Sequence, residues 1–173
     1  MLWVTRRCIR VNRAATGWLV RRFVDPTGTF RFVDPAEVAA VERSDRAIGF
    51  DAPGARYPHK DGRGRCSFEA LVEEYRPTDR ALRVLARIVH DADFPGEALS
   101  RPAGRGLLAF DVVSLLTGLG APAEAPVAEA AGLRAISSGF PLVSADDQET
   151  LQRAAFLYDS LYASLAERVA IKR

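Results

Sequence analysis

Strand-like and helix-like patterns alternate in the first third of the chain. The β-prone runs are short and bounded by polar or glycine-bearing segments, and one of them alternates strictly between apolar and polar residues: Leu2–Thr5, Thr29–Val33 and Ala47–Phe50. Asn12 is suited to cap a helix that reaches about Val24. Asp34, followed by Pro35 and Glu37, is suited to open a second helix that reaches about Arg43. The order strand, helix, strand, helix, strand predicts a small, mostly parallel sheet with crossover helices.

From Ser67 onward the apolar residues recur at helical spacing. Ser67 and Asp79 are suited to cap helices over Phe68–Tyr75 and Arg80–His90. Further helices are predicted in the last third, the last of them opened by Ser144 and Asp147: Gly106–Leu119, Ala125–Ser137 and a long helix to about Ile171. We therefore predict an α/β to α+β fold in one domain, with an α/β part over residues 1–55 and a loop-and-helix part over 56–173.

Length and composition agree with one well-packed domain. The chain has 173 residues, of which 48% are hydrophobic. No apolar run approaches the roughly 20 residues that cross a bilayer. Arg6, Arg7 and Arg10 interrupt any secretory pattern at the start. We expect a cytoplasmic protein with no membrane partner, in which Cys8 and Cys66 are reduced thiols.

Positive charge is concentrated near the start of the chain. The net charge is only +2, but up to Val33 there are seven arginines and one acid, Asp25. Such a segment attracts small anions, and Arg6, Arg7 and Arg22 are the candidate anion-binding residues. The alternative is an ordinary solvated surface. No aromatic interleaving or helix-turn-helix pattern accompanies the charge, so we expect no binding to nucleic acid by this chain alone.

The stretch "PHKDGRGRCSFEALVEEY", residues 58–75, holds the strongest candidate for a metal site. His59, Cys66 and Glu69 lie within eleven residues, and imidazole, thiolate and carboxylate are all ligands for zinc or iron. The dipole of the following helix is expected to lower the pKa of Cys66. In the alternative interpretation, Cys66 is a small buried hydrophobe and His59 a surface loop residue.

The second histidine gives two further hypotheses. His90, at the predicted end of its helix, is either a cap favoured by the helix dipole or a partner of the same ion. In the second case His90, Asp93 and Glu69 are the candidate catalytic residues, as further ligands or proton acceptors. Asp147 is interpreted as a helix-start carboxylate. No Ser-His-Asp spacing, phosphate-binding glycine loop or dinucleotide fingerprint is present.

Several blocks of sequence resemble the chromate-resistance protein family, specifically the C-terminal domain of ChrB-type proteins. They run in order from Trp3 to about Ala163 and include "NRAATGWLVRRFVDPTGTFRFV", "HKDGRGRCSFEALVEEY" and "LARIVHDADF". The family pattern D-R-x-A-C-P-W has Asn12, Thr16 and Gly17 here in place of the aspartate, cysteine and proline. Chemistry that uses that cysteine is therefore not expected. The resemblance also implies that the N-terminal DNA-binding region usual in ChrB-type proteins is lacking, since it starts at residue 3.

Two functions are compatible with these observations. The first is a small metal-dependent enzyme or redox protein, using zinc or iron, that acts on a small anionic substrate. The second is a non-catalytic domain that senses chromate, another oxyanion or a metal and acts through a protein partner. A purely structural role and a homodimer both stay open.

Overall fold

The computed structural model describes residues 1–96 and 127–171. Its sheet has three parallel strands in the order β2-β1-β3, with these bounds: β1 (Leu2–Arg6), β2 (Thr29–Val33) and β3 (Ile48–Gly49). The register of β1 and β2 runs from Leu2 opposite Thr29 to Arg6 opposite Val33. The predicted small parallel sheet with crossover helices is confirmed, although β3 is shorter than the predicted run.

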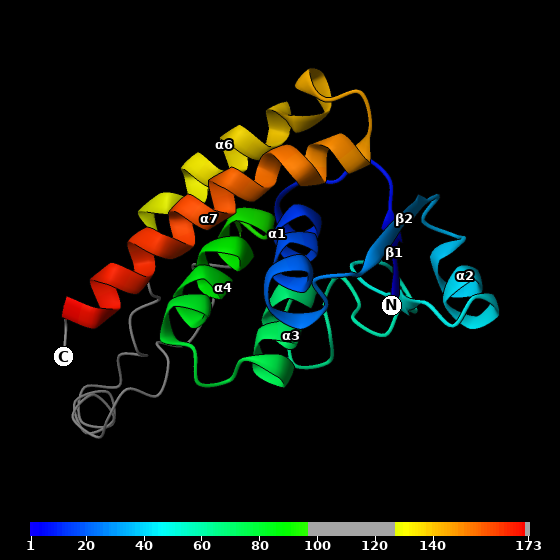
Figure 1. Cartoon of the computed structure of the whole chain (residues 1–173), viewed down its shortest axis with the longest axis horizontal. Helices are drawn as coiled ribbons and strands as arrows, with labels where there is room; N and C mark the ends of the chain where they lie inside the picture. The colour runs from blue at the N-terminus through cyan, green and yellow to red at the C-terminus, as the bar shows by residue number, and fades with distance from the viewer. Residues whose placement is uncertain (97–126, 172–173) are drawn as a thin grey trace.

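Helices make up most of the rest of the described chain. Their bounds are α1 (Val11–Leu19), a π-helical turn η1 (Val20–Val24), α2 (Val38–Ser44), α3 (Ser67–Tyr75), α4 (Arg80–Asp93), α6 (Ala128–Val143) and α7 (Asp147–Ile171). In Figure 1 the sheet and α2 lie at one end of the molecule, and α6 and α7 run side by side along the other. The predicted helical C-terminal half is confirmed.

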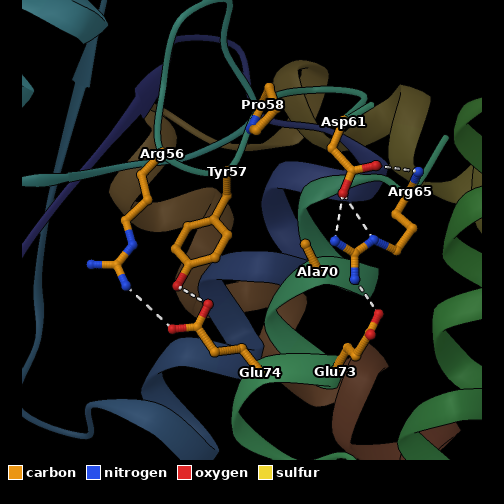
Figure 2. A pocket seen from close by; sticks show the side chains of 8 residues that line it. All are labelled: Arg56, Tyr57, Pro58, Asp61, Arg65, Ala70, Glu73 and Glu74. Carbon is orange, nitrogen blue, oxygen red and sulfur yellow. Dashed lines mark hydrogen bonds and ion pairs between the residues drawn. The ribbon is translucent and has the colours of Figure 1, made fainter. Parts of the chain in front are cut away.

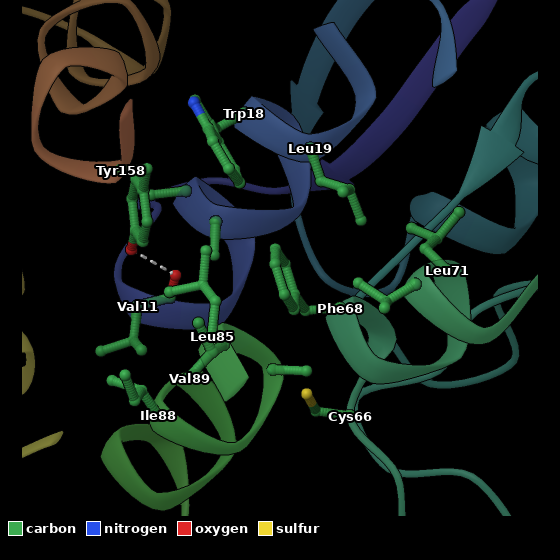
Figure 3. Packing of buried hydrophobic residues seen from close by; sticks show 14 of the residues in the cluster. Val11, Trp18, Leu19, Cys66, Phe68, Leu71, Leu85, Ile88, Val89 and Tyr158 are labelled. Atoms are coloured by element: carbon green, nitrogen blue, oxygen red, sulfur yellow. Dashed lines mark hydrogen bonds between the residues drawn. The ribbon is translucent and has the colours of Figure 1, made fainter. Parts of the chain in front are cut away.

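The sheet is covered on both faces, as parallel sheets usually are. Adjacent residues of a strand point to opposite faces, so Trp3 and Val4 of β1 enter two different apolar clusters. Val4 packs in the smaller cluster, with Val38 of α2. Trp3 belongs to the larger cluster, which joins the sheet to α1, α3, α4, α6 and α7. Figure 3 shows the centre of this cluster, where Phe68 lies among side chains from α1, α3 and α4.

The predicted N-caps Asn12 and Ser67 are both wrong, because each side chain is used in a contact between α1 and α3. α1 begins at Val11 with Arg10 at its N-cap position, so Asn12 lies inside the helix and is buried. α3 begins at Ser67 with Cys66 at its N-cap position. Asn12 Oδ1 accepts hydrogen bonds from the backbone N–H of Phe68 and from Ser67 Oγ, both at 3.2 Å. The side chain expected to cap α1 thus satisfies the start of α3, because tertiary packing brings the two helices together.

Other boundaries differ mostly by a turn or less, but α6 ends at Val143, six residues past the predicted Ser137. One prediction lies where no comparison is possible. Asp34 opens a turn, closed by the N–H of Glu37 donating to its carbonyl, before α2 begins. α4 continues three residues past His90 to Asp93. Asp79 caps α4 as predicted, since its Oδ1 accepts from Leu82 N–H at 3.0 Å. The predicted helix at 106–119 lies outside the described residues.

Over residues 1–96 and 127–171, no helix combines the length and the apolar character that a membrane crossing needs.

Candidate functional site

The candidate ligands gather where three parts of the chain meet. These are the loop that follows β3, the first turn of α3 and the last turn of α4. The described residues include two groups of possible metal-ligating side chains there. We call them the cysteine cluster (Cys66, Glu69 and His90) and the aspartate cluster (Asp51, His59 and Asp93).

The cysteine cluster is buried and is assembled from two helix ends. Cys66 is fully buried, and its backbone N–H donates to Glu69 Oε2 at 2.8 Å, as in a capping box. The same Oε2 lies 2.5 Å from Nδ1 of His90, which projects from the last turn of α4. One ligand atom from each residue lies within 4.8 Å of the others. Cys66 and Glu69 are brought together by spacing along one helix, and His90 is added by packing.

The electrostatics of Cys66 differ from the sequence expectation. Burial raises the pKa of the Cys66 thiol well above its ordinary value, and the neighbouring charge of Glu69 raises it further. The predicted lowering by the helix dipole is therefore wrong, because loss of hydration outweighs the dipole in a fully buried position. The thiol stays protonated unless a cation compensates the charge of the thiolate.

The donor set of the cysteine cluster fits a transition metal. A thiolate, an imidazole and a carboxylate are ligands for zinc and iron, and three protein ligands leave a position for water or substrate. Ionised Cys66 and Glu69 together carry the two negative charges that balance a divalent ion.

The aspartate cluster centres on the buried carboxylate of Asp51. Its Oδ1 lies 2.6 Å from Nδ1 of His59 and accepts from Asn12 Nδ2 at 2.7 Å. Its Oδ2 accepts from Arg6 at 2.9 Å and pairs with Arg13 at 3.5 Å. Burial by itself would raise the pKa of Asp51, but the hydrogen bond from His59 and the surrounding positive charges hold it below its ordinary value.

The pKa values of the other two members of the aspartate cluster are both raised, for different reasons. The hydrogen bond to Asp51 raises the pKa of His59, whose ring is about two-fifths exposed. Burial, together with the charge of Asp51, raises the pKa of Asp93 to about 6. Asp93 Oδ2 is 3.6 Å from His59 Nδ1, and it has no hydrogen bond within the described residues. The cluster can therefore hold and exchange protons near neutral pH.

The ring of Phe94 contacts the histidine of each cluster. Its centroid lies 4.8 Å from that of His59 and 4.9 Å from that of His90. The predicted ligand set His59, Cys66 and Glu69 is divided, because the ligand atom of His59 groups with those of Asp51 and Asp93. The predicted partnership of His90 with Asp93 is divided in the same way.

Of the three predicted anion-binding arginines, the structure places one at the site. Arg6 contacts Asp51, whereas Arg7 pairs with Asp34 at 3.4 Å in an exposed position. Arg22 pairs with Asp159 of α7 at 2.7 Å, in contact with neither cluster. Sequence reasoning did not select Arg13 and Asp51. Asp51 directly follows a predicted strand, and ligands of parallel sheets bind at the carboxyl ends of the strands. Its position in the sequence could therefore have identified Asp51 as a site residue.

A polar cavity of about 380 Å³ lies between α3 and the loop that joins β3 to α3. Figure 2 shows Arg65 between Asp61 and Glu73, and Tyr57 bonded to Glu74. Arg65 reaches Asp61 at 2.7 Å, and the Tyr57 hydroxyl donates to Glu74 at 2.8 Å. These contacts tie the loop that carries His59 to α3.

Residues 3–117 match the family described as ChrB, C-terminal domain. The chain belongs to this family. It is also similar to Protein ChrB of Cupriavidus metallidurans, with 30% identity over 161 residues that cover 92% of this chain and 39% of that protein. The ChrB-family domain thus spans about two-fifths of the length of that relative. No solved structure matches the chain.

Two of the three departures of this ChrB-family domain from the family pattern, Asn12 and Thr16, lie beside the site. Thr16 Oγ1 is 3.2 Å from Ser67 Oγ and donates to Asn12 Oδ1 at 3.3 Å. Both residues are buried next to the start of α3. Gly17 lies against Leu151 of α7. The positions of the family aspartate and cysteine therefore border the site, and here they hold neutral hydrogen-bonding side chains.

Proposed function

We propose that this ChrB-family domain binds one divalent transition metal, zinc or iron, at the cysteine cluster and acts on a small anionic molecule beside it. The observation that carries the proposal is the convergence of Cys66, Glu69 and His90, with ligand atoms within 4.8 Å, in a buried place. A buried thiol, imidazole and carboxylate have no packing advantage over apolar side chains, and a metal ion would compensate the cost of burying them.

Charge balance favours the cysteine cluster over the aspartate cluster for the metal. A divalent ion neutralises the two negative charges of Cys66 and Glu69. In the aspartate cluster, the charges of Asp51 and Asp93 are already opposed by Arg6 and Arg13. A second dication there would leave a large net positive charge in a partly buried place, which is unfavourable.

The aspartate cluster is suited to bind an anion and to exchange protons. Asp51 holds the Nδ1 side of the His59 ring, so Nε2 is the nitrogen directed away from that carboxylate. Arg6 and Arg13 offset Asp51 and Asp93, so a protonated His59 gives the cluster its net positive charge. A zinc or iron ion in the cysteine cluster would supply Lewis acidity or a redox centre. Within the chain itself, His59 and Asp93 are the residues placed to accept or donate protons.

Metal content of purified variants tests the proposal. We expect about one equivalent of metal per chain in the wild type and a sharp loss in Cys66→Ser and His90→Gln. Cys8→Ser is the matched control, because Cys8 is the other cysteine of the chain and is exposed. His59→Gln should keep its metal, in contrast to the prediction from sequence. Equal metal content in the wild type, Cys66→Ser and His90→Gln would refute the proposal.

One observation favours a sensing role as the second candidate. His90 lies on α4, and α4 packs against both α6 and α7. A metal ion in the cysteine cluster would therefore shift α4, and the shift would be passed to α6 and α7. A protein partner bound to α6 and α7 would sense this change. Hydrogen exchange of α6 and α7 with and without added zinc separates the two candidates. Strong metal-dependent protection there, with no turnover of any oxyanion tested, would favour sensing.

A further inference from the structure

Two polar groups of the aspartate cluster have no hydrogen bond with any residue that the structure describes. The first is the carboxylate of Asp93, whose Oδ2 is buried and lies 3.6 Å from His59 Nδ1, too far for a hydrogen bond. The second is Nε2 of His59, because Nδ1 is the ring nitrogen that meets Asp51 at 2.6 Å. A buried carboxylate oxygen without a donor is costly, so the orphan oxygen of Asp93 needs a physical explanation.

The missing partner of Asp93 is a hydrogen-bond donor. Near neutral pH Asp93 is mostly ionised, since burial and the charge of Asp51 raise its pKa only to about 6. An ionised carboxylate accepts hydrogen bonds and donates none. The neighbouring donors of Arg6, Asn12 and His59 are directed to Asp51. A molecule bound beside His59 is therefore the source of a donor for Asp93 that the site is built to use.

The charge of the cluster favours a singly charged anion. Its positive groups are Arg6, Arg13 and the protonated His59, and its negative groups are Asp51 and Asp93, so one net positive charge remains. A monoanion balances that charge. A dianion would leave net negative charge beside the Asp93 carboxylate, which is unfavourable in a partly buried place.

We propose that the aspartate cluster selects an oxyanion that carries a hydroxyl group, the chemistry shared by dihydrogen phosphate and bicarbonate. One oxygen of the anion accepts from His59 Nε2–H, and its hydroxyl donates to the Asp93 carboxylate. Asp93 then determines specificity, because an oxyanion without a proton, such as sulfate, directs lone pairs at a carboxylate. The inference rests on the proposed function only in taking the aspartate cluster as the anion site, and it does not require a metal.

Inorganic phosphate and sulfate are the matched probes. Both are tetrahedral oxyanions of similar size, and at neutral pH phosphate carries a proton whereas sulfate does not. The chain has two histidines, and His59 belongs to the aspartate cluster while His90 belongs to the cysteine cluster. The NMR signal of the His59 imidazole therefore reports anion binding at this site and not at surface arginines. We expect the wild type to bind phosphate about tenfold or more tightly than sulfate, as one charge-assisted hydrogen bond allows.

Replacing Asp93 separates the hydrogen bond from the charge. If charge alone mattered, Asp93→Leu would tighten both anions, since it removes a negative group. Loss of the acceptor should instead weaken phosphate by about tenfold or more and leave sulfate no weaker than in the wild type. Asp93→Asn should bind the two anions alike, because an amide both accepts and donates. Asp34→Asn is the matched control, an exposed acid that follows β2, and it should keep the wild-type preference.

Three results would overturn the inference. In the first, the wild type binds sulfate as tightly as phosphate, as expected if a water molecule satisfies Asp93. In the second, Asp93→Leu keeps the preference for phosphate. In the third, neither anion moves the His59 signal, which would also refute anion binding in the proposed function.

Metal content of the same samples keeps the two proposals apart. A protein that contains metal but does not discriminate between the anions would refute this inference alone. A metal-free protein that prefers phosphate in the way described would support it and count against the metal site.

Discussion

Replacing Asn12 by aspartate tests the hydrogen-bond network that joins the two clusters. Asn12 is 1% exposed, and its Nδ2 donates to Asp51 Oδ1 at 2.7 Å while its Oδ1 accepts from the start of α3. Aspartate has nearly the same shape but no N–H donor. When ionised, it would place a second negative charge against Asp51. Because Arg6 and Arg13 keep Asp51 ionised, the new carboxyl must take up a proton to restore the donor.

The cost of that proton gives the magnitude. A carboxyl with an ordinary pKa of about 3.9 resists protonation by about 1.4 kcal/mol for each pH unit above that value. Asn12→Asp should therefore lose up to about 4 kcal/mol of unfolding free energy near pH 7 and less than about 1 kcal/mol near pH 4.5. The pKa is raised in the folded state, so the folded protein binds more protons and its stability falls as pH rises. A loss of that size is a large part of the stability of a typical domain.

Urea unfolding at the two pH values, followed by circular dichroism, measures this loss. Gln152→Glu is the matched control, because it makes the same amide-to-acid change at an exposed position of α7. It should change stability little at either pH. If Asn12→Asp were equally destabilised near pH 4.5 and near pH 7, the loss would come from shape and not from charge, and the reasoning would be refuted.

Two further predictions concern a partly buried acid, Asp93, and a buried glycine, Gly17. Burial and the charge of Asp51 raise the pKa of Asp93 to about 6, so the metal-free protein should lose stability as pH rises from about 4 to about 6, by at most about 3 kcal/mol. Asp93→Asn should remove this dependence and be the more stable protein near pH 7 in urea unfolding; a variant no more stable than wild type would contradict the prediction. A Cβ on Gly17 would lie 2.6 Å from Leu151 Cδ1, so Gly17→Ala should cost about 1–3 kcal/mol in thermal unfolding. The double variant with Leu151→Ala should lose less than the sum of the two single losses, and purely additive losses would show that the two positions do not share the space.

Sequence alone was sufficient where the decisive interactions are local. The alternation in Thr29–Val33 and the helical period of the last helix identify β2 and α7, since each pattern repeats over a few residues. Asp79 caps α4 because an N-cap bond reaches only three residues along the chain. The grouping of Cys66 with Glu69 follows in the same way from their position in one helical turn.

Only the tertiary structure decided which buried polar groups meet. His90 contacts Glu69 from another helix, and His59 turns to Asp51 and not to Cys66. Asn12 has the residue type of a cap, but its partners come from two distant segments. The pKa of Cys66 rises because the depth of burial, which no local pattern encodes, outweighs the helix dipole. A buried polar side chain must find its partners within the assembled core, so its role is set by contacts between elements that are far apart in the chain.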